Sequence, residues 1–247
     1  MDIRWFDSLN STNQYCKLLD PATVGEFTVI CAHSQTAGIG QQGNVWISEP
    51  SKNLTFSIIL KPSFLAAADQ YRLTMALAVA VAECVDCLLS NLNPRPSVQI
   101  KWPNDIYVGN SKICGILATS QLIGQSLSQS ICGIGLNINQ TCFPEWIPNP
   151  TSLRLLTNHD YSLDDVLHSL LDSIGRCYRQ IQVSEGCDDI RDRYLNRLYR
   201  LGVEAGYLYG GKEIRATING IDHFGRLLLT GDDGRRLTCD LKEIRFL

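Results

Sequence analysis

Strand-like segments separated only by short turns are the feature that most constrains the fold of this 247-residue chain. Residues 98–101, 105–108 and 112–120 follow one another closely, and a hairpin-like turn joins the last two. A long apolar segment at 66–89 has helical spacing instead. Strands are therefore clustered with helices and no regular strand–helix–strand alternation is present, which favours an α+β fold.

The remaining segments divide the chain into two parts. Further strands are expected at 27–33, 54–60 and 129–139, and helices at 14–19, 163–181 and 188–199. After Leu201 the pattern changes to short strands at 213–221, 226–230, 235–240 and 243–247, with tight turns between them. Such closely spaced strands are typical of a small barrel. The sequence thus predicts one domain over 1–200 and a second over 201–247.

Charge and hydropathy restrict the classes of partner. The 22 Lys and Arg residues against 25 Asp and Glu residues give a net charge of −3, which leaves no broad basic surface for DNA or an anionic membrane. The first residues contain no apolar signal-peptide core, and nowhere does an apolar run reach the length of a membrane span. We expect a soluble, cytoplasmic protein whose ten cysteines stay reduced and pack as small apolar side chains.

A glycine-rich segment lies between two of the expected strands. Gly38, Gly40 and Gly43 in the long loop 34–51 allow a backbone to approach a ligand closely and to present N–H groups to an anion. No Gly-Lys-Ser or Gly-Lys-Thr follows, so the segment is not a Walker motif. By itself the segment also fits a plain surface loop.

Two lysine-containing segments are candidates for binding an anion. Lys101-Trp102-Pro103-Asn104-Asp105 places an ammonium that can neutralise a phosphate beside an amide and a carboxylate, and Asp105 can either hold Mg²⁺ or accept a turn hydrogen bond. An ordinary strand end with a proline turn explains the same five residues. Lys112 begins an apolar strand, where a lysine is at the surface by default. If both lysines point into one cleft, they form an anion site.

A fourth segment, Gly133-Ile134-Gly135-Leu136-Asn137-Ile138-Asn139, ends a strand with two glycines and two asparagines, which suits a backbone that lies against a flat ligand. In this order and spacing, the motifs resemble the biotin protein ligase (biotin–acetyl-CoA-carboxylase ligase) family over nearly the whole chain. The matching segments are 7–13, 35–38 with Gly40, Gly43 and Trp46, 53–54, 101–105, 112–117, 133–139 and, more weakly, 220–225.

The resemblance implies a fold and a reaction. The fold is a class II synthetase-like catalytic domain, a mixed β-sheet flanked by helices, followed by a small SH3-like β-barrel. The reaction uses MgATP to convert the substrate biotin to biotinyl-5′-adenylate and pyrophosphate. The biotinyl group is then transferred to one lysine of a biotin carboxyl carrier domain of acetyl-CoA carboxylase or a related carboxylase. Members of the family differ in oligomeric state, so a homodimer is compatible with the resemblance.

The resemblance also assigns roles to residues. Biotin binding is assigned to Ser11, Thr12, Asn13, Gln35, Gly38, Ile39, Gly40, Gln41, Lys112 and Gly115. Nucleotide binding is assigned to Trp46, Asn104 and Asn137, and Asp105 is the candidate metal ligand. Lys112 and Lys101 are the expected catalytic residues. The first would polarise the carboxylate of biotin, and the second would neutralise phosphate charge as pyrophosphate departs.

The glycine-rich loop departs from the family pattern. The family commonly has Gly-Arg-Gly-Arg-x-Gly-Arg-x-Trp, whereas residues 38–46 contain no arginine. A charge-assisted hydrogen bond typically contributes about 1.5–3 kcal/mol. Our hypothesis is that biotinyl-adenylate is held loosely, and that loop amides with Lys101 and Lys112 stabilise most of the phosphate charge. The catalytic motifs begin within the first dozen residues, so we expect a monofunctional ligase without an N-terminal winged helix or a repressor role.

Two alternatives stay open at this point. One is a lipoate-type ligase of similar fold, although the segments 101–105 and 112–115 fit the biotin branch better. The other is a module that binds biotin or adenylate without turnover, in which the arginine-free loop reflects lost activity. Retention of Lys101, Lys112 and Trp46 argues against the second alternative.

Overall fold

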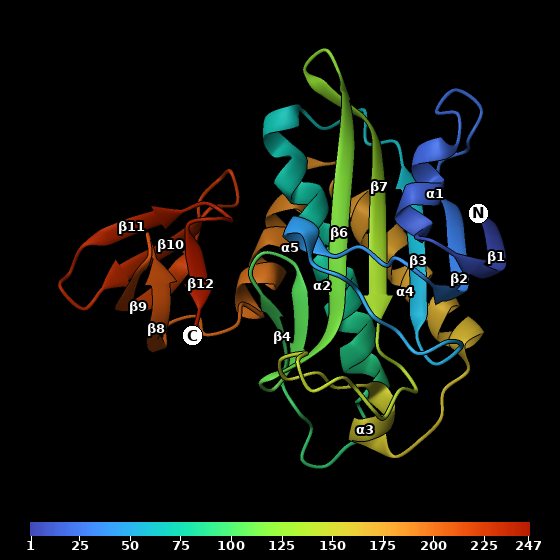
Figure 1. The fold of residues 1–247 in the computed structure, drawn as a ribbon. Coiled ribbons are helices and arrows are strands. Elements are labelled where there is room, and N and C mark those ends of the chain that lie inside the picture. Colours follow the sequence, from blue (N-terminus) through green and yellow to red (C-terminus); the bar gives the residue numbers. More distant parts are fainter.

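In the computed structural model, the backbone of residues 1–247 and every side chain except that of Gln42 are described. The molecule consists of a seven-stranded sheet that carries helices on both faces and a separate five-stranded sheet formed by the C-terminal residues (Figure 1). Among the described residues, no helix combines the length and the apolar character needed to cross a membrane.

The larger sheet has the strand order β1-β2-β3-β7-β6-β5-β4. Its strands are β1 (Asp2–Leu9), β2 (Thr28–Gln35), β3 (Leu54–Leu60), β4 (Val98–Lys101), β5 (Asp105–Val108), β6 (Ser111–Ile123) and β7 (Ser126–Leu136). Only β1 and β2 pair in parallel, and the other neighbours are antiparallel, so the sheet is mixed. The α+β class and the mixed sheet that we expected are confirmed.

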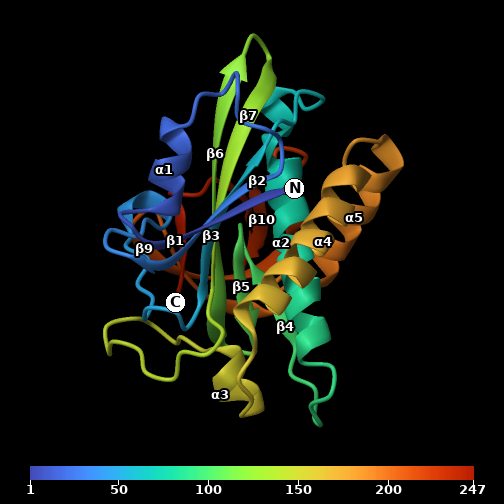
Figure 2. The ribbon, with the colours of Figure 1, turned by 90° about the vertical axis from the view of Figure 1, so that its right-hand side faces the viewer.

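The helices lie on opposite faces of this sheet. They are α1 (Thr12–Leu18), α2 (Gln70–Leu88), α3 (Leu153–Thr157), α4 (Leu163–Gln180) and α5 (Ser184–Asn196), with 3-10 turns η1 (Gln41–Gly43) and η2 (Ala67–Asp69). Helix α1 covers one face and α2, α4 and α5 cover the other (Figure 2). Because α2 lies between the sheet and the other two helices, it is apolar on nearly all sides, and 11 of its 19 residues are buried.

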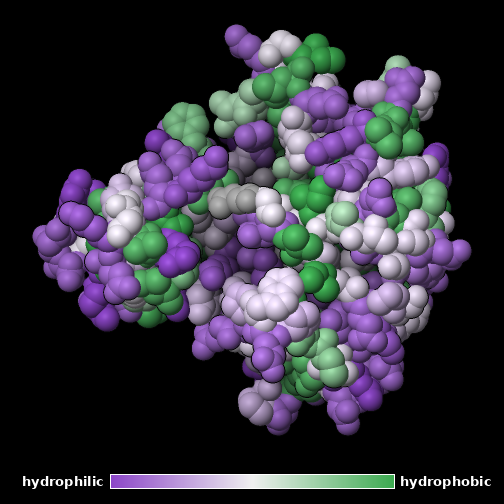
Figure 3. Space-filling view, viewed as in Figure 1, coloured by the Kyte–Doolittle hydropathy of each residue, from purple (hydrophilic) through white to green (hydrophobic). Residues whose placement is uncertain are grey.

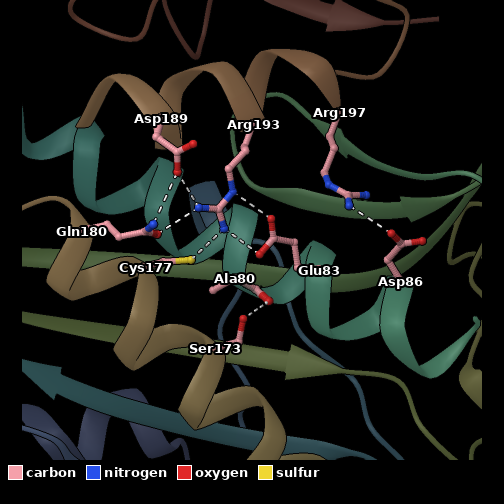
Figure 4. Close-up of polar contacts among 9 residues, drawn as sticks. All are labelled: Ala80, Glu83, Asp86, Ser173, Cys177, Gln180, Asp189, Arg193 and Arg197. Atoms are coloured by element: carbon pink, nitrogen blue, oxygen red, sulfur yellow. Dashed lines mark hydrogen bonds and ion pairs between the residues drawn. The ribbon is translucent and has the colours of Figure 1, made fainter. Parts of the chain in front are cut away.

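Polar contacts fasten the three helices behind the sheet to one another (Figure 4). The guanidinium of Arg193 on α5 forms two hydrogen bonds to the Glu83 carboxylate on α2, at 2.9 and 2.6 Å. It also bonds Gln180 on α4 and Asp189 on its own helix. Arg197 pairs with Asp86 at 3.0 Å one turn further along. These bidentate and charged contacts fix α2 as a rigid support behind the strands that carry the site.

The smaller sheet has the order β11-β10-β9-β8-β12 and is entirely antiparallel. Its strands are β8 (Glu204–Tyr209), β9 (Lys212–Ile221), β10 (Leu227–Gly231), β11 (Arg236–Cys239) and β12 (Ile244–Phe246). Within the described chain β11 and β12 do not pair, so the expected barrel is observed as a sheet with two edges. Apolar side chains of the smaller sheet, such as Tyr207 and Leu227, join the same buried cluster as those of the larger sheet.

Among the strands and α-helices, three lack a counterpart in the expected segments. These are β1, α3 and β8. Strands β1 and β8 are mostly half-exposed or exposed, and charged or small residues interrupt their apolar positions. The ten cysteines are all free; eight of them are buried and pack as apolar side chains as expected, whereas Cys87 and Cys142 are exposed.

Candidate active site

Two adjoining hollows lie over the sheet on the side of α1. The inner pocket, a cavity of about 130 Å³, is lined by residues 11–13, 35, 39–41, 44–46, 56, 105, 112, 115–117 and 133–135. The outer cleft, about 880 Å³, is lined by residues 44–47, 101, 105, 107, 110, 112, 137, 143, 146–150, 199–200 and 245–247. The surface is visibly hollowed between the smaller sheet and the main body (Figure 3). The cleft therefore combines residues of both sheets.

The start of α1 forms one wall of the inner pocket. Ser11 caps the helix, accepting a hydrogen bond from the amide of Gln14 at 3.5 Å. The amide of Thr12 donates to the Gln35 side chain at 2.8 Å, and the Thr12 hydroxyl lies 2.9 Å from that of Ser57 on β3. These contacts link α1 to strands β2 and β3 and fix the position of the next residue, Asn13.

Asn13 is the most informative side chain in this pocket. It is only 3% exposed, yet both the nitrogen and the oxygen of its amide are buried without a hydrogen-bond partner among the described residues. Leaving one buried polar group unsatisfied typically costs about 1–3 kcal/mol. The amide faces the backbone of Gly133, where an added Cβ would lie 3.5 Å from Nδ2. Such an amide is suited to a ligand that offers a donor and an acceptor side by side.

A flat surface made of two glycines forms the floor between the pocket and the cleft. Gly115 on β6 and Gly135 on β7 are register partners, and the indole of Trp46 lies over both. A Cβ at Gly135 would be 2.2 Å from Trp46 Cε2, and one at Gly115 would be 3.1 Å from Cζ3. The segment 133–139 is expected to lie against a flat ligand, and this stays a prediction, because the flat group at Gly135 is the chain's own indole.

The glycine-rich loop folds back on itself above this floor. The amide of Trp46 donates to Gly38 O at 3.0 Å, and the amide of Gly40 donates to Asn44 O at 2.7 Å. A Cβ at Gly38 would be 2.3 Å from the carbonyl oxygen of Trp46, so only glycine allows this approach. The loop therefore positions Trp46 over Gly115 and Gly135. Gly38 packs against the backbone of Trp46 and does not line the inner pocket.

The two hollows meet at Lys112 and Asp105, which line both. Lys112 Nζ lies 2.6 Å from Asp105 Oδ2, and both side chains are 30% exposed. Lys112 Nζ is also 6.0 Å from the centre of the Trp46 ring. The Lys112 ammonium is thus partly shielded from water, and it lies where a ligand in the inner pocket would meet a ligand in the outer cleft.

Lys101 points into the outer cleft between aromatic rings. Its Nζ donates to the Tyr107 hydroxyl at 3.2 Å and lies 5.0 Å from the ring centres of Tyr107 and Phe246. Burial lowers the pKa of Lys101, opposed by the charge of Asp105 and assisted by those of Lys112 and Arg200. Lys101 and Lys112 both line this cleft, which is the condition under which the two lysines would form an anion site.

The described residues do not form a metal site of their own. They include no group of three or more His, Cys, Asp and Glu side chains that could hold an ion. The carboxylate of Asp105 already binds Lys112, so its assignment to Mg²⁺ stays a prediction.

The two asparagines assigned to the nucleotide lie in different places. Asn137 lines the outer cleft, its Nδ2 donating to Thr151 O at 2.9 Å while its Oδ1 is buried without a partner in the described structure. Asn104 Nδ2 donates to Ile116 O on β6, and the residue lines neither the pocket nor the cleft. Its position suggests a part in holding the turn 101–105, and its role toward the nucleotide stays a prediction.

Several residues of the cleft had no signal in the sequence. Tyr107, Arg200 and Phe246 come from three distant segments, and Phe143 and Trp146 belong to a connection without regular structure. The Trp146 side chain is 66% exposed at the mouth of the cleft. Of these residues, Phe246 comes from the smaller sheet, which brings its ring beside Lys101.

Comparison with known proteins places the chain in a family. The model of the biotin/lipoate A/B protein ligase family matches residues 5–137. A biotin–[acetyl-CoA-carboxylase] ligase of Paracoccus denitrificans is 30% identical over 233 residues, covering 92% of this chain and 94% of that protein. The bifunctional ligase/repressor BirA of Bacillus subtilis is 30% identical over 236 residues, covering 93% of this chain and 67% of that protein.

A solved structure agrees over the full length. The biotin protein ligase from Aquifex aeolicus in complex with biotin and ATP matches with a TM-score of 0.82 and 25% identity, covering 100% of this chain and 99% of that one. The fold, the order of the motifs and these likenesses together show that the chain belongs to the biotin/lipoate A/B protein ligase family.

Proposed function

We propose that this protein is a biotin protein ligase, which activates biotin with MgATP and transfers it to a lysine of a biotin carboxyl carrier domain. The carboxylate of biotin attacks the α-phosphate of ATP, a C–O–P anhydride forms, and pyrophosphate leaves. The lysine amine of the carrier then attacks the acyl carbon, and AMP leaves. The observation that carries the proposal is the position of Lys112, which lines both the inner pocket and the outer cleft.

The inner pocket suits the head group of biotin. A cyclic urea presents two N–H donors beside one carbonyl acceptor, and the unpartnered amide of Asn13 can pair with both kinds of group. Ser11, Thr12, Gln35, Ile39, Gly40 and Gln41 line the same pocket, as does Gly115. We propose that these residues bind biotin, with Gly38 holding the loop that covers it.

The outer cleft suits a nucleotide. We propose that Trp46, beside Lys112 at the inner end, packs against the adenylate, and that Asn137 binds it from β7. Lys101 and Lys112 face the phosphates. In this reaction the repulsion between a carboxylate and a phosphate must be overcome, and cations fixed in a partly buried site achieve this without a side-chain nucleophile.

The relatives support the partner and leave finer points as predictions. Biotin and a biotin-accepting carboxylase domain follow from the ligase of Paracoccus denitrificans. A homodimer, the absence of a DNA or membrane partner and a cytoplasmic location stay predictions. So does the division into a catalytic domain at 1–200 and a smaller domain at 201–247.

The test is the mass of a biotin carboxyl carrier domain after incubation with the purified protein and MgATP. Parallel samples contain biotin or lipoate. A mass increase of one biotinyl group with biotin, and none with lipoate, supports the proposal. Lipoylation in place of biotinylation would move the protein to the lipoate branch of the family. No modification, together with tight binding of biotin, would favour a binding module without turnover.

A further inference from the structure

The turn between β4 and β5 is held more tightly than a surface turn requires. Trp102 and Asn104 are 7% and 4% exposed, and Pro103 between them is also buried. The turn separates Lys101 from Asp105, the two charged residues that it sends into the outer cleft. Whatever fixes the turn therefore fixes a lysine and a carboxylate of the proposed site.

A glycine of the smaller sheet holds this turn on one side. Trp102 Nε1 donates to the carbonyl oxygen of Gly225 at 2.8 Å, a buried hydrogen bond between residues 123 positions apart. Gly225 lies in the connection between β9 and β10 with φ +82°. It packs face-on against the Tyr71 ring of α2, where an added Cβ would be 2.0 Å from Cγ. Both the backbone angle and the contact require glycine at this position.

Two tyrosines hold the turn on the other side. The Tyr71 hydroxyl donates to that of Tyr194 on α5 at 2.8 Å, and Tyr194 donates to Pro103 O at 2.8 Å. These contacts thus form a continuous chain from Trp102 through Gly225, Tyr71 and Tyr194 back to Pro103 of the same turn. Burial raises the pKa of both phenols, so they stay protonated and able to donate at any physiological pH.

The connection that carries Gly225 is itself ordered by one carboxylate. Asp222 accepts hydrogen bonds from the amides of Phe224 and Arg226, both at 2.9 Å, and from Arg226 Nε at 2.7 Å. The Gly225 amide in turn donates to Asp222 O at 3.1 Å. The carbonyl of Gly225 is therefore aimed at Trp102 by a preformed loop, and it needs no contact with substrate to do so.

We propose that Gly225 is a positioning residue for adenylate formation, which acts through Trp102 to fix Lys101 and Asp105. The inference rests on the proposed function. The smaller sheet then holds the turn at two points, since Phe246 also packs against Lys101 Nζ at 5.0 Å. A displacement of about 1 Å in a group that must meet a transition state can cost about 100-fold in rate.

A matched pair of glycine substitutions tests the proposal. Gly225→Ala brings a Cβ into the Tyr71 ring, whereas Gly234→Ala adds one at a similar φ of +79° with no atom within 4 Å. Both variants bear the same kind of backbone strain, in connections between strands of the same sheet. We expect Gly225→Ala to lower kcat for pyrophosphate release at least tenfold with the Kd for biotin unchanged, and Gly234→Ala to stay within twofold of wild type. Equal rates in the two variants would overturn the proposal.

A second variant decides the question if Gly225→Ala does not fold. Trp102→Phe keeps an aromatic ring in the same space and removes the N–H that donates a hydrogen bond to the carbonyl oxygen of Gly225. We expect kcat for pyrophosphate release to fall about three- to tenfold, as the loss of one hydrogen bond predicts, with the Kd for biotin unchanged. A wild-type kcat in Trp102→Phe would overturn the inference. Failure of the proposed function looks different, because the wild-type protein would then release no pyrophosphate.

Discussion

Lys112 Nζ lies 2.6 Å from Asp105 Oδ2 at the boundary between the inner pocket and the outer cleft. Asp105 begins β5, and Lys112 follows Ser111 at the start of β6. In the absence of substrate, the Asp105 carboxylate holds the Lys112 ammonium in place. An incoming carboxylate or phosphate can replace Asp105 as the partner of this ammonium. The geometry thus supplies a cation that is held ready where the two substrates of the proposed reaction meet.

Replacing Asn13 separates binding from stability. In Asn13→Ala a buried amide without partners is lost, so the free energy of unfolding of the ligand-free protein is expected to stay equal or to rise. The affinity for biotin should fall by about 1–3 kcal/mol, or about 5- to 150-fold, because the urea group loses its partner. Denaturant unfolding and calorimetric titration with biotin measure the two quantities.

The control for this prediction is another buried asparagine. Asn53 is 2% exposed and fully bonded, to Ser48, Gln140 and the amide of Ile138. Asn53→Ala should therefore lower the free energy of unfolding by about 1–3 kcal/mol. Equal destabilisation by the two substitutions would contradict the view that the Asn13 amide is kept for a ligand.

A methyl group at Gly135 should displace Trp46. The added Cβ would lie 2.2 Å from the indole, whereas the Cβ of a control substitution, Gly25→Ala, would come no closer than 3.7 Å to any atom. We expect Gly135→Ala to raise the KM for ATP and to lower the rate of adenylate formation at least about tenfold, or about 1.4 kcal/mol. Tryptophan fluorescence reports the displacement directly. An unchanged fluorescence spectrum with an unchanged KM for ATP would show that the contact with Gly135 does not determine the position of Trp46.

The rate of adenylate formation should depend on the protonation of Lys101. Burial lowers the pKa of this lysine below its ordinary value of about 10.4. As the pH rises, the ammonium is lost earlier than in an exposed lysine, so pyrophosphate release should decline with a midpoint below about 10.4. Lys101→Arg keeps its charge, so its normalised profile should decline only at a higher pH than that of the wild-type protein. The assay omits the carrier domain, whose own lysine titrates. The same decline in both proteins would assign it to another group.

An arginine restored to the glycine-rich loop should prolong retention of the adenylate. Gln41 lines the inner pocket at one of the positions where the family pattern has arginine. If the arginine-free loop holds the adenylate loosely, Gln41→Arg should extend the half-life of the bound adenylate by about 10- to 100-fold. The reason is that one charge-assisted hydrogen bond contributes about 1.5–3 kcal/mol. Pro50→Arg adds the same charge on an exposed part of the loop and should have no such effect. Equal half-lives in the two variants would argue against the hypothesis.

The sequence predicted those parts of the fold and site that depend on local order. Strands β4, β5 and β6 follow one another along the chain, so the sequence could name Lys101, Asp105 and Lys112 as candidates for one site. Contacts across the chain left no such signal. Nothing local indicates that Gly225 meets Trp102, or that Phe246 covers Lys101. Strand β1 was missed for a related reason, because it is a half-exposed edge strand whose order comes from pairing with β2.

Formation of biotinyl-5′-adenylate by the purified protein from biotin and MgATP, followed by mass spectrometry without a carrier domain, tests the central claim most directly. We expect the wild-type protein to form adenylate and pyrophosphate in equal amounts. We expect adenylate formation to be at least about 100-fold slower in Lys112→Gln, because this substitution removes the charge at the junction of pocket and cleft. No adenylate from a folded wild-type protein that binds biotin, or an equal rate in Lys112→Gln, would contradict this claim.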